Sequence, residues 1–249
     1  MNVPAPVVVV VAADHDTLAA AVAARTITML CDALATQPEA HLCLTGGSIG
    51  TASLAAITES AACAAVDWAS VHVWWSDERF EPAGDALRNE SGARAALLDH
   101  VPLVSENVHP MPASGDRWGS DVHSAAASYA DELLRVGNGV VPEFDVLLLG
   151  VGPDGHVASL FPSHAALADP GVTCGVTDSP KPPPTRITFT LPTINRAREV
   201  WLVASGAEKS ESMGQALSEG PPSGLPAALV HGSRHTLALL DRAAAARLG

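Results

Sequence analysis

The sequence predicts an α/β protein built on a doubly wound, mostly parallel β-sheet with helices on both faces. Short β-branched runs alternate with longer segments of helical apolar spacing along the whole chain. Hydrophobic residues make up 47% of the chain and charged residues only 16%, as in a compact globular protein. Parallel neighbours need crossover connections, and the helices in these crossovers cover both faces of the sheet.

The predicted elements follow one another in βα order. Strands are expected at 7–12, 41–44, 71–75, 144–149, 187–191, 200–203 and 236–240. Helices are expected at 18–34, 51–63, 90–98, 122–136 and 208–217. Because the pattern continues across the proline-rich segment 179–184, we expect a single domain over residues 1–249. Ligands of such sheets bind at the carboxyl ends of the strands.

The charge balance narrows the class of partner. The chain carries 27 acidic and 14 basic residues, a formal net charge of -13, which repels a nucleic-acid backbone over most of the surface. We therefore expect no nucleic-acid partner. A small anion can still bind where a few of the scarce cations converge with backbone N–H groups.

The N-terminal segment and the cysteines indicate the cellular compartment of the protein. The apolar run 7–11 has no basic segment before it and is closely followed by Asp14 and Asp16, which favours a strand over a targeting or membrane segment. Four cysteines without a C-x-x-C pair lie mostly in apolar runs, as buried reduced thiols do. We expect a cytoplasmic protein with no membrane partner.

The first candidate loop, Thr45-Gly46-Gly47-Ser48, joins a short apolar strand to a helix. Backbone N–H groups and the helix dipole would then point at one spot, which suits a phosphate group. Two alternatives stay open. Paired glycines can simply permit a tight turn. Gly46 to Gly50 also spells G-x-S-x-G, the nucleophile elbow of serine hydrolases, although no H-G-G-G segment precedes it.

The second candidate loop, residues 75–80, carries three charges directly after a strand that ends in two tryptophans. The charged residues are Asp77, Glu78 and Arg79. A solvated turn would account for charges alone, but the carboxyl end of a strand in this fold faces a cleft. We therefore interpret this loop as part of the site.

The third candidate loop follows the most apolar strand and runs from Gly150 to His156. A histidine in such a turn can act as a general base, since its ordinary pKa is about 6.5, and Asp154 could orient it. A purely structural histidine is the alternative. The loop also matches G-x-G-x-x-G, but Pro162 interrupts the long helix that a dinucleotide site needs, so no nicotinamide cofactor is expected.

The fourth group consists of Arg186 at the start of a strand and Lys209 at the start of a helix. Arginine offers a bidentate fork and lysine a point charge to a phosphate, although each alone could be an ordinary surface cation. His231 and His235 are separated by Gly232 and Ser233, which argues against a helical metal site. We expect chemistry without a metal or cofactor.

Taken together, these segments resemble the 6-phosphogluconolactonase family over nearly the whole chain. The matching segments are L-T-G-G-S, W-S-D-E-R-F with a following Asn89, L-L-G-V-G-P-D-G-H-V-A-S-L-F-P, R-I-T-F-T-L-P, V-A-S-G-A-E-K and L-L-D-R-A-A-A. The D-E-R and G-P-D-G-H-V-A-S-L-F-P segments are the most specific. The glycine loop is shared with related sugar-phosphate enzymes. The resemblance implies a Rossmann-like fold of the sugar-phosphate isomerase type.

The resemblance implies hydrolysis of 6-phospho-D-glucono-1,5-lactone to 6-phospho-D-gluconate, the second step of the oxidative pentose phosphate pathway. For this reaction we hypothesise that His156 activates the water, Asp154 or Asp77 holds the imidazole, and Arg79 stabilises the oxyanion. The residues that would bind the phosphorylated sugar lactone are Gly46, Gly47, Ser48, Asn89, Arg186 and Lys209.

Two departures from the family pattern and two alternative functions accompany this interpretation. Arg88 stands where serine is common before Asn89, and Ile49-Gly50 replaces a frequent Thr-Pro. A glucosamine-6-phosphate deaminase would carry F-N-E-P where this chain has residues 159–162, so it would hold a carboxylate that is missing here.

A non-catalytic sugar-phosphate sensor is the second alternative, and it would bind the sugar phosphate without turnover. We expect a monomer or a small homo-oligomer.

Overall fold

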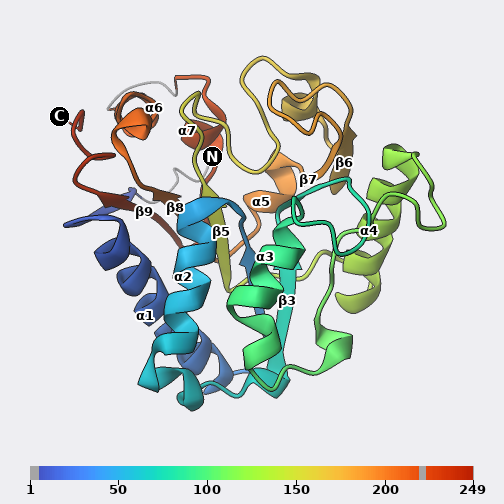
Figure 1. The fold of residues 1–249 in the computed structure, drawn as a ribbon, viewed down its shortest axis with the longest axis horizontal. Coiled ribbons are helices and arrows are strands. Elements are labelled where there is room, and N and C mark those ends of the chain that lie inside the picture. The colour runs from blue at the N-terminus through green and yellow to red at the C-terminus, as the bar shows by residue number, and fades with distance from the viewer. Residues whose placement is uncertain (1–5, 219–222, 249) are drawn as a thin grey trace.

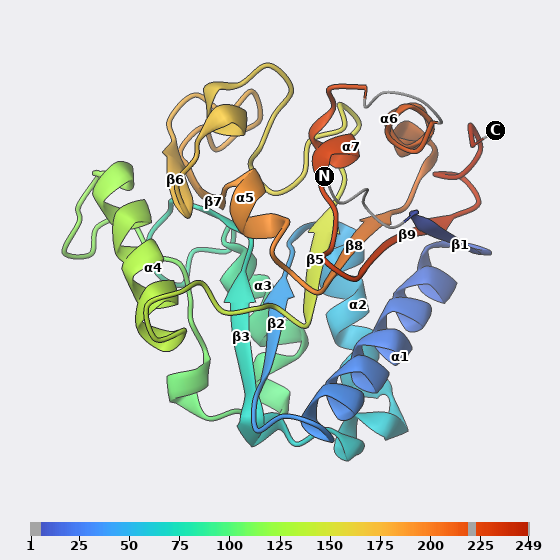
Figure 2. The same ribbon diagram turned by 180° about the vertical axis from the view of Figure 1, so that it is seen from behind.

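The computed structural model describes residues 6–218 and 223–248. Its main sheet has six parallel strands in the order β1-β9-β8-β5-β2-β3 (Figures 1 and 2). The strands are β1 (Val8–Ala12), β2 (Ala40–Leu44), β3 (Val71–Trp75), β5 (Val146–Gly150), β8 (Glu199–Ala204) and β9 (His235–Asp241). The predicted α/β class with a mostly parallel sheet is confirmed.

The order of the strands reverses beside β2. The chain leaves β2 toward β3 at one edge of the sheet and later returns to place β5 on the other side of β2, where Leu42 pairs with Val146. The loops after β2 and β5 therefore diverge from neighbouring strand ends and leave a crevice between them.

Helices cover both faces of the main sheet. One face packs against α1 (His15–Leu34), α2 (Gly47–Glu59) and α3 (Asn89–Ala96), which lie in front of the sheet in Figure 1. The other face packs against α4 (Val122–Val136), α5 (Leu191–Ile194), α6 (Ser210–Ala216) and α7 (Pro226–Leu229). Alternation along β2 shows the two layers, because Leu42 and Leu44 join the first core and Cys43 joins the second.

A second, antiparallel sheet corrects part of the sequence prediction. It contains β4 (Asp77–Arg79), β6 (Thr173–Val176) and β7 (Arg186–Phe189) in the order β4-β7-β6. The segment predicted as a loop at 75–80 contains β4, and the strand predicted at 187–191 lies in this second sheet and ends at Phe189, because Leu191 already begins α5. A three-residue charged run has no strand tendency of its own, and its pairing with β7 arises only in the folded chain.

The first two helices begin earlier than the sequence prediction. Asp14 caps α1 by accepting a hydrogen bond from the backbone of Thr17 at 2.9 Å. Helix α2 starts at Gly47, inside the glycine loop, and ends at Glu59. Glycine is a poor interior helix residue, so periodicity placed the start too late, whereas the first turn tolerates it.

Helix α1 is long and apolar enough to cross a membrane by length and composition. In this fold it packs against α2, β1 and β9, as core helices of globular proteins do. Its buried face includes Leu18, Val22 and Leu30.

Three histidines gather at the amino end of the main sheet. His41 on β2 lies in register with His72 on β3, and their rings are 4.8 Å apart. His72 Nδ1 lies 2.9 Å from Nε2 of His109, and Trp74 Nε1 donates to His41 Nδ1 at 3.1 Å. Burial lowers the pKa of His72 and His109, and burial followed by the neighbouring rings lowers the pKa of His41 to about 3.

These histidines make the folded protein sensitive to acid. A histidine with a lowered folded pKa takes up a proton on unfolding, so its contribution to stability is full above about pH 6.5 and declines as the pH falls below it. We expect His41→Asn, which keeps an acceptor for Trp74 but does not titrate, to reduce the pH dependence of the free energy of unfolding. The reduction should approach about 1.4 kcal/mol per pH unit between roughly pH 6 and 4.

Urea denaturation across this pH range measures the effect. His15→Asn is the matched control, because the His15 side chain is 39% exposed and lies outside this histidine cluster. Identical pH slopes for wild type and His41→Asn would contradict the prediction.

Candidate active site

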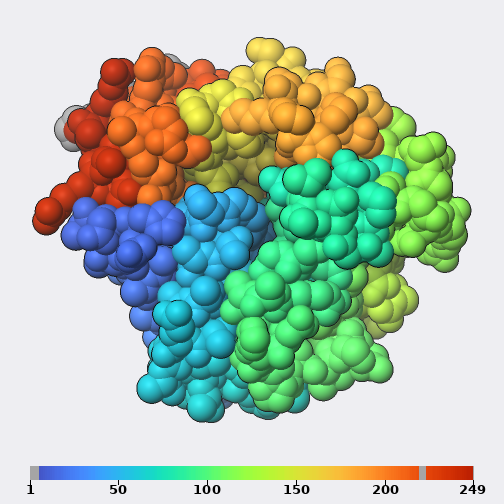
Figure 3. Space-filling model, viewed as in Figure 1, coloured from blue at the N-terminus to red at the C-terminus, as the bar shows by residue number. Residues whose placement is uncertain are grey.

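One pocket lies at the carboxyl end of the main sheet, where the loops after β2, β5 and β8 meet β4 and the start of β7. Figure 3 shows a hollow between the blue end of α2, the teal segment near residue 80 and the yellow and orange segments above them. All the predicted catalytic and binding residues except Asp154 line this pocket: Gly46, Gly47, Ser48, Asp77, Arg79, Asn89, His156, Arg186 and Lys209. The fold therefore brings the four predicted segments together.

The glycine loop forms the first turn of α2. Gly46 is the N-cap and Gly47 has a φ of 80°, a conformation that L side chains rarely adopt. A Cβ on Gly46 would overlap the side-chain amide of Asn89, so the two residues are in direct contact. Thr45 Oγ1 accepts a hydrogen bond from Gly150 N at 2.9 Å and ties this loop to the one after β5. The free N–H groups of α2 thus face the pocket.

Asp77 is buried and held by several partners. Ser159 Oγ donates to its Oδ2 at 2.7 Å, and Arg186 Nη1 lies 3.9 Å from the same oxygen. Asn89 Nδ2 donates to the backbone carbonyl of Asp77 at 2.9 Å. Of the two carboxylates that the sequence offered as support for the histidine, Asp77 is thus engaged with other residues.

Glu78 has a structural task inside the same segment. Its carboxylate accepts hydrogen bonds from the backbone of Asn89 at 2.6 Å and of Glu90 at 2.8 Å, at the start of α3. Burial raises the pKa of Glu78, and this effect exceeds the lowering caused by the nearby positive charge of Arg88. Arg88, the departure from the family pattern, is itself buried and donates to the carbonyl of Met111 at 2.7 Å. Together these charges fix Asn89 beside the glycine loop.

Arg79 lines the pocket at the end of β4. Its Nη1 donates to the carbonyl of Leu87 at 2.5 Å. Its Nε is buried and has no hydrogen-bond partner among the described residues. Because this Nε is shielded, a donor from Arg79 to an oxyanion in the pocket must come from the ends of the guanidinium.

His156 and Asp154 form a close pair. His156 Nδ1 lies 2.5 Å from Asp154 Oδ1, which fixes the imidazole and leaves Nε2 for the pocket. Burial lowers the pKa of His156, and this effect outweighs the opposite effect of the hydrogen bond that Asp154 accepts. Burial by itself would raise the pKa of Asp154, but the bond to His156 and the nearby Lys181 lower it to about 2. The imidazole is therefore neutral and the carboxylate charged at neutral pH.

Arg186 is less available to a phosphate than the sequence suggested. Its Nε donates to the carbonyl of Pro183 at 3.1 Å, and Nη2 donates to the carbonyls of Lys181 and Pro182 at 3.1 and 3.2 Å. Nη1 is the guanidinium nitrogen nearest Asp77. Arg186 thus shapes the segment before β7 as well as lining the pocket.

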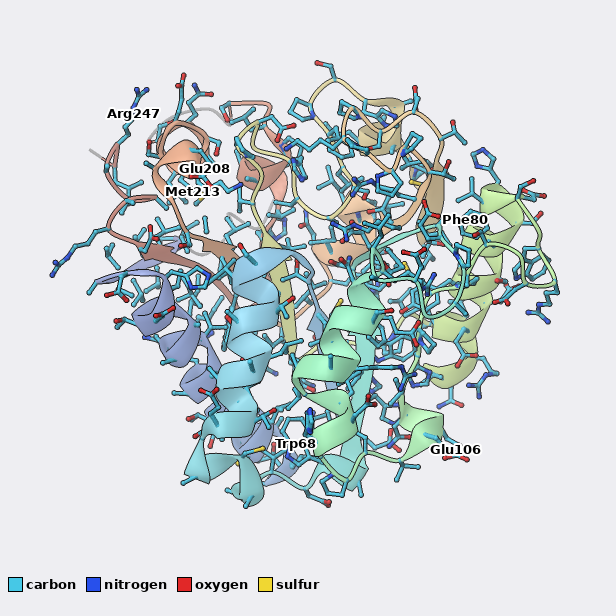
Figure 4. The ribbon with its side chains drawn as sticks, in the orientation of Figure 1. Trp68, Phe80, Glu106, Glu208, Met213 and Arg247 are labelled. Carbon is cyan, nitrogen blue, oxygen red and sulfur yellow. The ribbon has the colours of Figure 1, made fainter. Side chains whose placement is uncertain are left out.

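Lys209 reaches the pocket from the turn after β8. Burial lowers its pKa, and its Nζ lies 3.9 Å from Glu208 Oε1; Figure 4 shows Glu208 in the turn that precedes α6. Asp241, at the end of β9, accepts hydrogen bonds from Ser205 Oγ at 2.6 Å and Gly206 N at 3.0 Å. This carboxylate fixes the turn that delivers Lys209.

The geometry does not support the serine-nucleophile or dinucleotide interpretations of the glycine-rich motifs. Ser48 makes no hydrogen bond to a histidine within residues 6–218 and 223–248, although a serine nucleophile needs such a base. After Gly155 the chain forms turns and a short 3₁₀ segment at Ala165–Ala168 rather than the long helix of a dinucleotide site. Over the same residues, no group of three or more His, Cys, Asp and Glu side chains could hold a metal ion.

Sequence reasoning missed four polar residues of this region: Ser159, Lys181, Ser205 and Glu208. One signal was available for Lys181, because the chain contains only two lysines and Lys209 had already been singled out. Ser159 carried no such signal. Its contact with Asp77 joins residues that lie 82 positions apart in the sequence.

Comparison with known proteins places the chain in a family. The model of a family described as glucosamine-6-phosphate isomerases/6-phosphogluconolactonase matches residues 13–239. A 6-phosphogluconolactonase from Streptomyces coelicolor is 50% identical over 244 residues, covering 96% of this chain and 94% of the relative.

Solved structures share the fold. A 6-phosphogluconolactonase from Trypanosoma brucei matches with a TM-score of 0.85 and 26% identity over 99% of this chain and 100% of its own. A monomeric glucosamine-6-phosphate deaminase matches with a TM-score of 0.79 and 19% identity over 96% and 99%, a likeness of fold alone. The family match and the extent of identity show that this chain belongs to the glucosamine-6-phosphate isomerase/6-phosphogluconolactonase family.

Proposed function

We propose that this chain hydrolyses 6-phospho-D-glucono-1,5-lactone to 6-phospho-D-gluconate, the second step of the oxidative pentose phosphate pathway. One observation carries the proposal: a neutral histidine supported by a carboxylate opens into the same pocket as a helix N-terminus and Lys209. The first pair suits water activation, and the second group suits a phosphate. The 50% identity to a 6-phosphogluconolactonase supports the same reaction.

In this mechanism His156 acts as the general base. Its Nε2 accepts a proton from a water molecule, which attacks the lactone carbonyl, while Asp154 holds Nδ1–H and stabilises the imidazolium that forms. The ring C–O bond then breaks, and the proton passes from His156 to the departing ring oxygen. Arg79 donates to the carbonyl oxygen as negative charge develops on it.

Binding of the phosphate is assigned to the glycine loop and Lys209. The N-terminal turn of α2, from Gly46 to Ser48, and Lys209 would hold it, with Arg186 and Asn89 shaping the wall. Binding energy away from the carbonyl positions the ring for attack. Each group would thus affect either substrate binding or the chemical step more strongly.

Phe161 favours the lactonase over the deaminase. The ring of Phe161 lies 4.7 Å from the ring of His156 and is fully buried, in the segment where the deaminase pattern supplies a carboxylate. An aromatic ring cannot shuttle the protons that ring opening and ammonia release require. Lactone hydrolysis needs only the one base.

We also propose that residues 1–249 act as one domain in the cytoplasm, without a metal or cofactor, as a monomer or small homo-oligomer. Contiguous cores on both faces of the six-stranded sheet support a single folding unit. The proposed reaction is a hydrolysis and transfers no electrons, so it needs no redox cofactor.

The first test is the initial rate of hydrolysis of freshly made lactone, with spontaneous hydrolysis subtracted. We expect wild type to accelerate the reaction and His156→Ala to lower kcat by about 100-fold or more, because the general base is lost. Lys209→Ala should mainly raise KM, since it removes a charge that binds ground state and transition state alike.

Ser48→Ala serves as the control for a serine-nucleophile mechanism and should keep a measurable kcat. Absence of acceleration by wild type would overturn the lactonase, and release of ammonia from glucosamine 6-phosphate would then favour the deaminase. Binding of 6-phosphogluconate without turnover would favour a sensor. A kcat effect of Lys209→Ala with unchanged KM would contradict the assigned roles.

A second test addresses the contact between the glycine loop and α3. Gly46→Ala places a methyl group on the Asn89 amide, so we expect a rise in KM of about tenfold and a loss of stability of about 1–3 kcal/mol. Gly92→Ala is the matched control in α3, where the new Cβ would make only an ordinary 3.5 Å contact with Thr51. It should leave KM unchanged, and thermal unfolding with steady-state kinetics measures both variants. Equal KM values for all three proteins would refute the steric argument.

A further inference from the structure

Both lysines of the chain lie in the candidate active site. Among 14 basic residues, only Lys181 and Lys209 are lysines, and both line the pocket. Lys209 is assigned to the phosphate above. Lys181 has a different set of neighbours, which points to a different task.

The ammonium group of Lys181 sits against the catalytic pair. Its Nζ lies 3.0 Å from Asp154 Oδ1 and 3.2 Å from His156 Nδ1. The same oxygen of Asp154 is 2.5 Å from His156 Nδ1. The lysine and the histidine therefore share one carboxylate oxygen, and the positive charge lies within hydrogen-bonding distance of the imidazole.

The segment that carries Lys181 is held in place by its backbone. Ser179 Oγ donates to the carbonyl of Lys181 at 2.8 Å and accepts from its N–H at 3.2 Å. Buried Arg186 adds the hydrogen bond from Nη2 to the same carbonyl. Two residues thus fix the backbone of a side chain that is itself about one-third exposed, which favours a positioned charge over a surface lysine.

We propose that Lys181 is a positioning residue that holds Asp154 charged beside His156 and keeps the imidazole neutral, and therefore able to accept a proton, at neutral pH. The inference rests on the proposed lactone hydrolysis. Without Lys181, the bare carboxylate of Asp154 would stabilise the imidazolium more strongly, and His156 would be protonated over a wider pH range.

The charges around His156 are arranged for this opposition. Asp154 and, from β4, Asp77 favour the protonated imidazole, whereas burial and Lys181 disfavour it, and the net effect is a lowered pKa. The remaining charged residues of the pocket are Arg79, Arg186, Glu208 and Lys209. Among the cations, Lys181 is the one in direct contact with the imidazole.

The test compares the pH dependence of kcat/KM for lactone hydrolysis in wild type, Lys181→Met and Lys181→Arg. Met removes the charge but keeps an unbranched side chain, and we expect the acidic limb to move to higher pH by roughly 0.5–1 unit. This corresponds to a loss of about 3–10-fold on that limb, with a smaller effect at alkaline pH. Arg keeps the charge and should leave the limb near its wild-type position.

An unmoved acidic limb in Lys181→Met overturns the proposal. So does a change confined to KM, which would make Lys181 a substrate ligand, and so does an equal shift in Lys181→Arg. A second measurement needs no substrate: titration of the His156 ring by NMR in histidine-labelled protein should show the same upward shift in the Met variant.

This second measurement separates the two ideas. If wild type fails to hydrolyse the lactone, the proposed function fails, while the NMR titration still decides whether Lys181 controls the charge of His156. An unchanged titration in folded Lys181→Met overturns the inference even where wild type is active.

Discussion

Strands β2 and β5 lie side by side although the chain leaves β2 toward β3, and the centre of the site depends on this reversal. The two following loops diverge from one edge, tied by the hydrogen bond between Gly150 N and Thr45 Oγ1. One loop supplies the N-terminal turn of α2 and the other supplies His156. Strand β8, next to β5, adds Lys209 at the same edge.

Buried charges fix the geometry around this edge. Glu78 holds the start of α3, Asp77 is bound to Ser159, and Asp241 fixes the turn before Lys209. A buried carboxylate is costly unless its oxygens are satisfied, so each arrangement tolerates little displacement. These carboxylates keep side chains from separate elements in one pocket. Because they are bonded to groups of the protein itself, an acidic chain can still offer a pocket that suits an anion.

Histidines lie at both ends of the main sheet, but in different surroundings. At the amino end, His109 stacks on His72 and Trp74, His41 packs beside them, and burial lowers the pKa of all three histidines. At the carboxyl end, His156 has a carboxylate on one nitrogen and the pocket on the other. The position of a histidine relative to the strand ends therefore decides whether it packs in the core or faces the pocket.

The sequence by itself determined the βα alternation, the parallel sheet and the segments that form the pocket, because periodicity and glycine-rich turns are local properties. The tertiary structure alone decided the β4-β7 pairing, the engagement of Asp77 with Ser159 and Arg186 instead of His156, and the contact of Lys181 with Asp154 and His156. The physical reason is distance along the chain: Lys181 and Asp154 are 27 residues apart, and no local pattern encodes a contact that only folding creates.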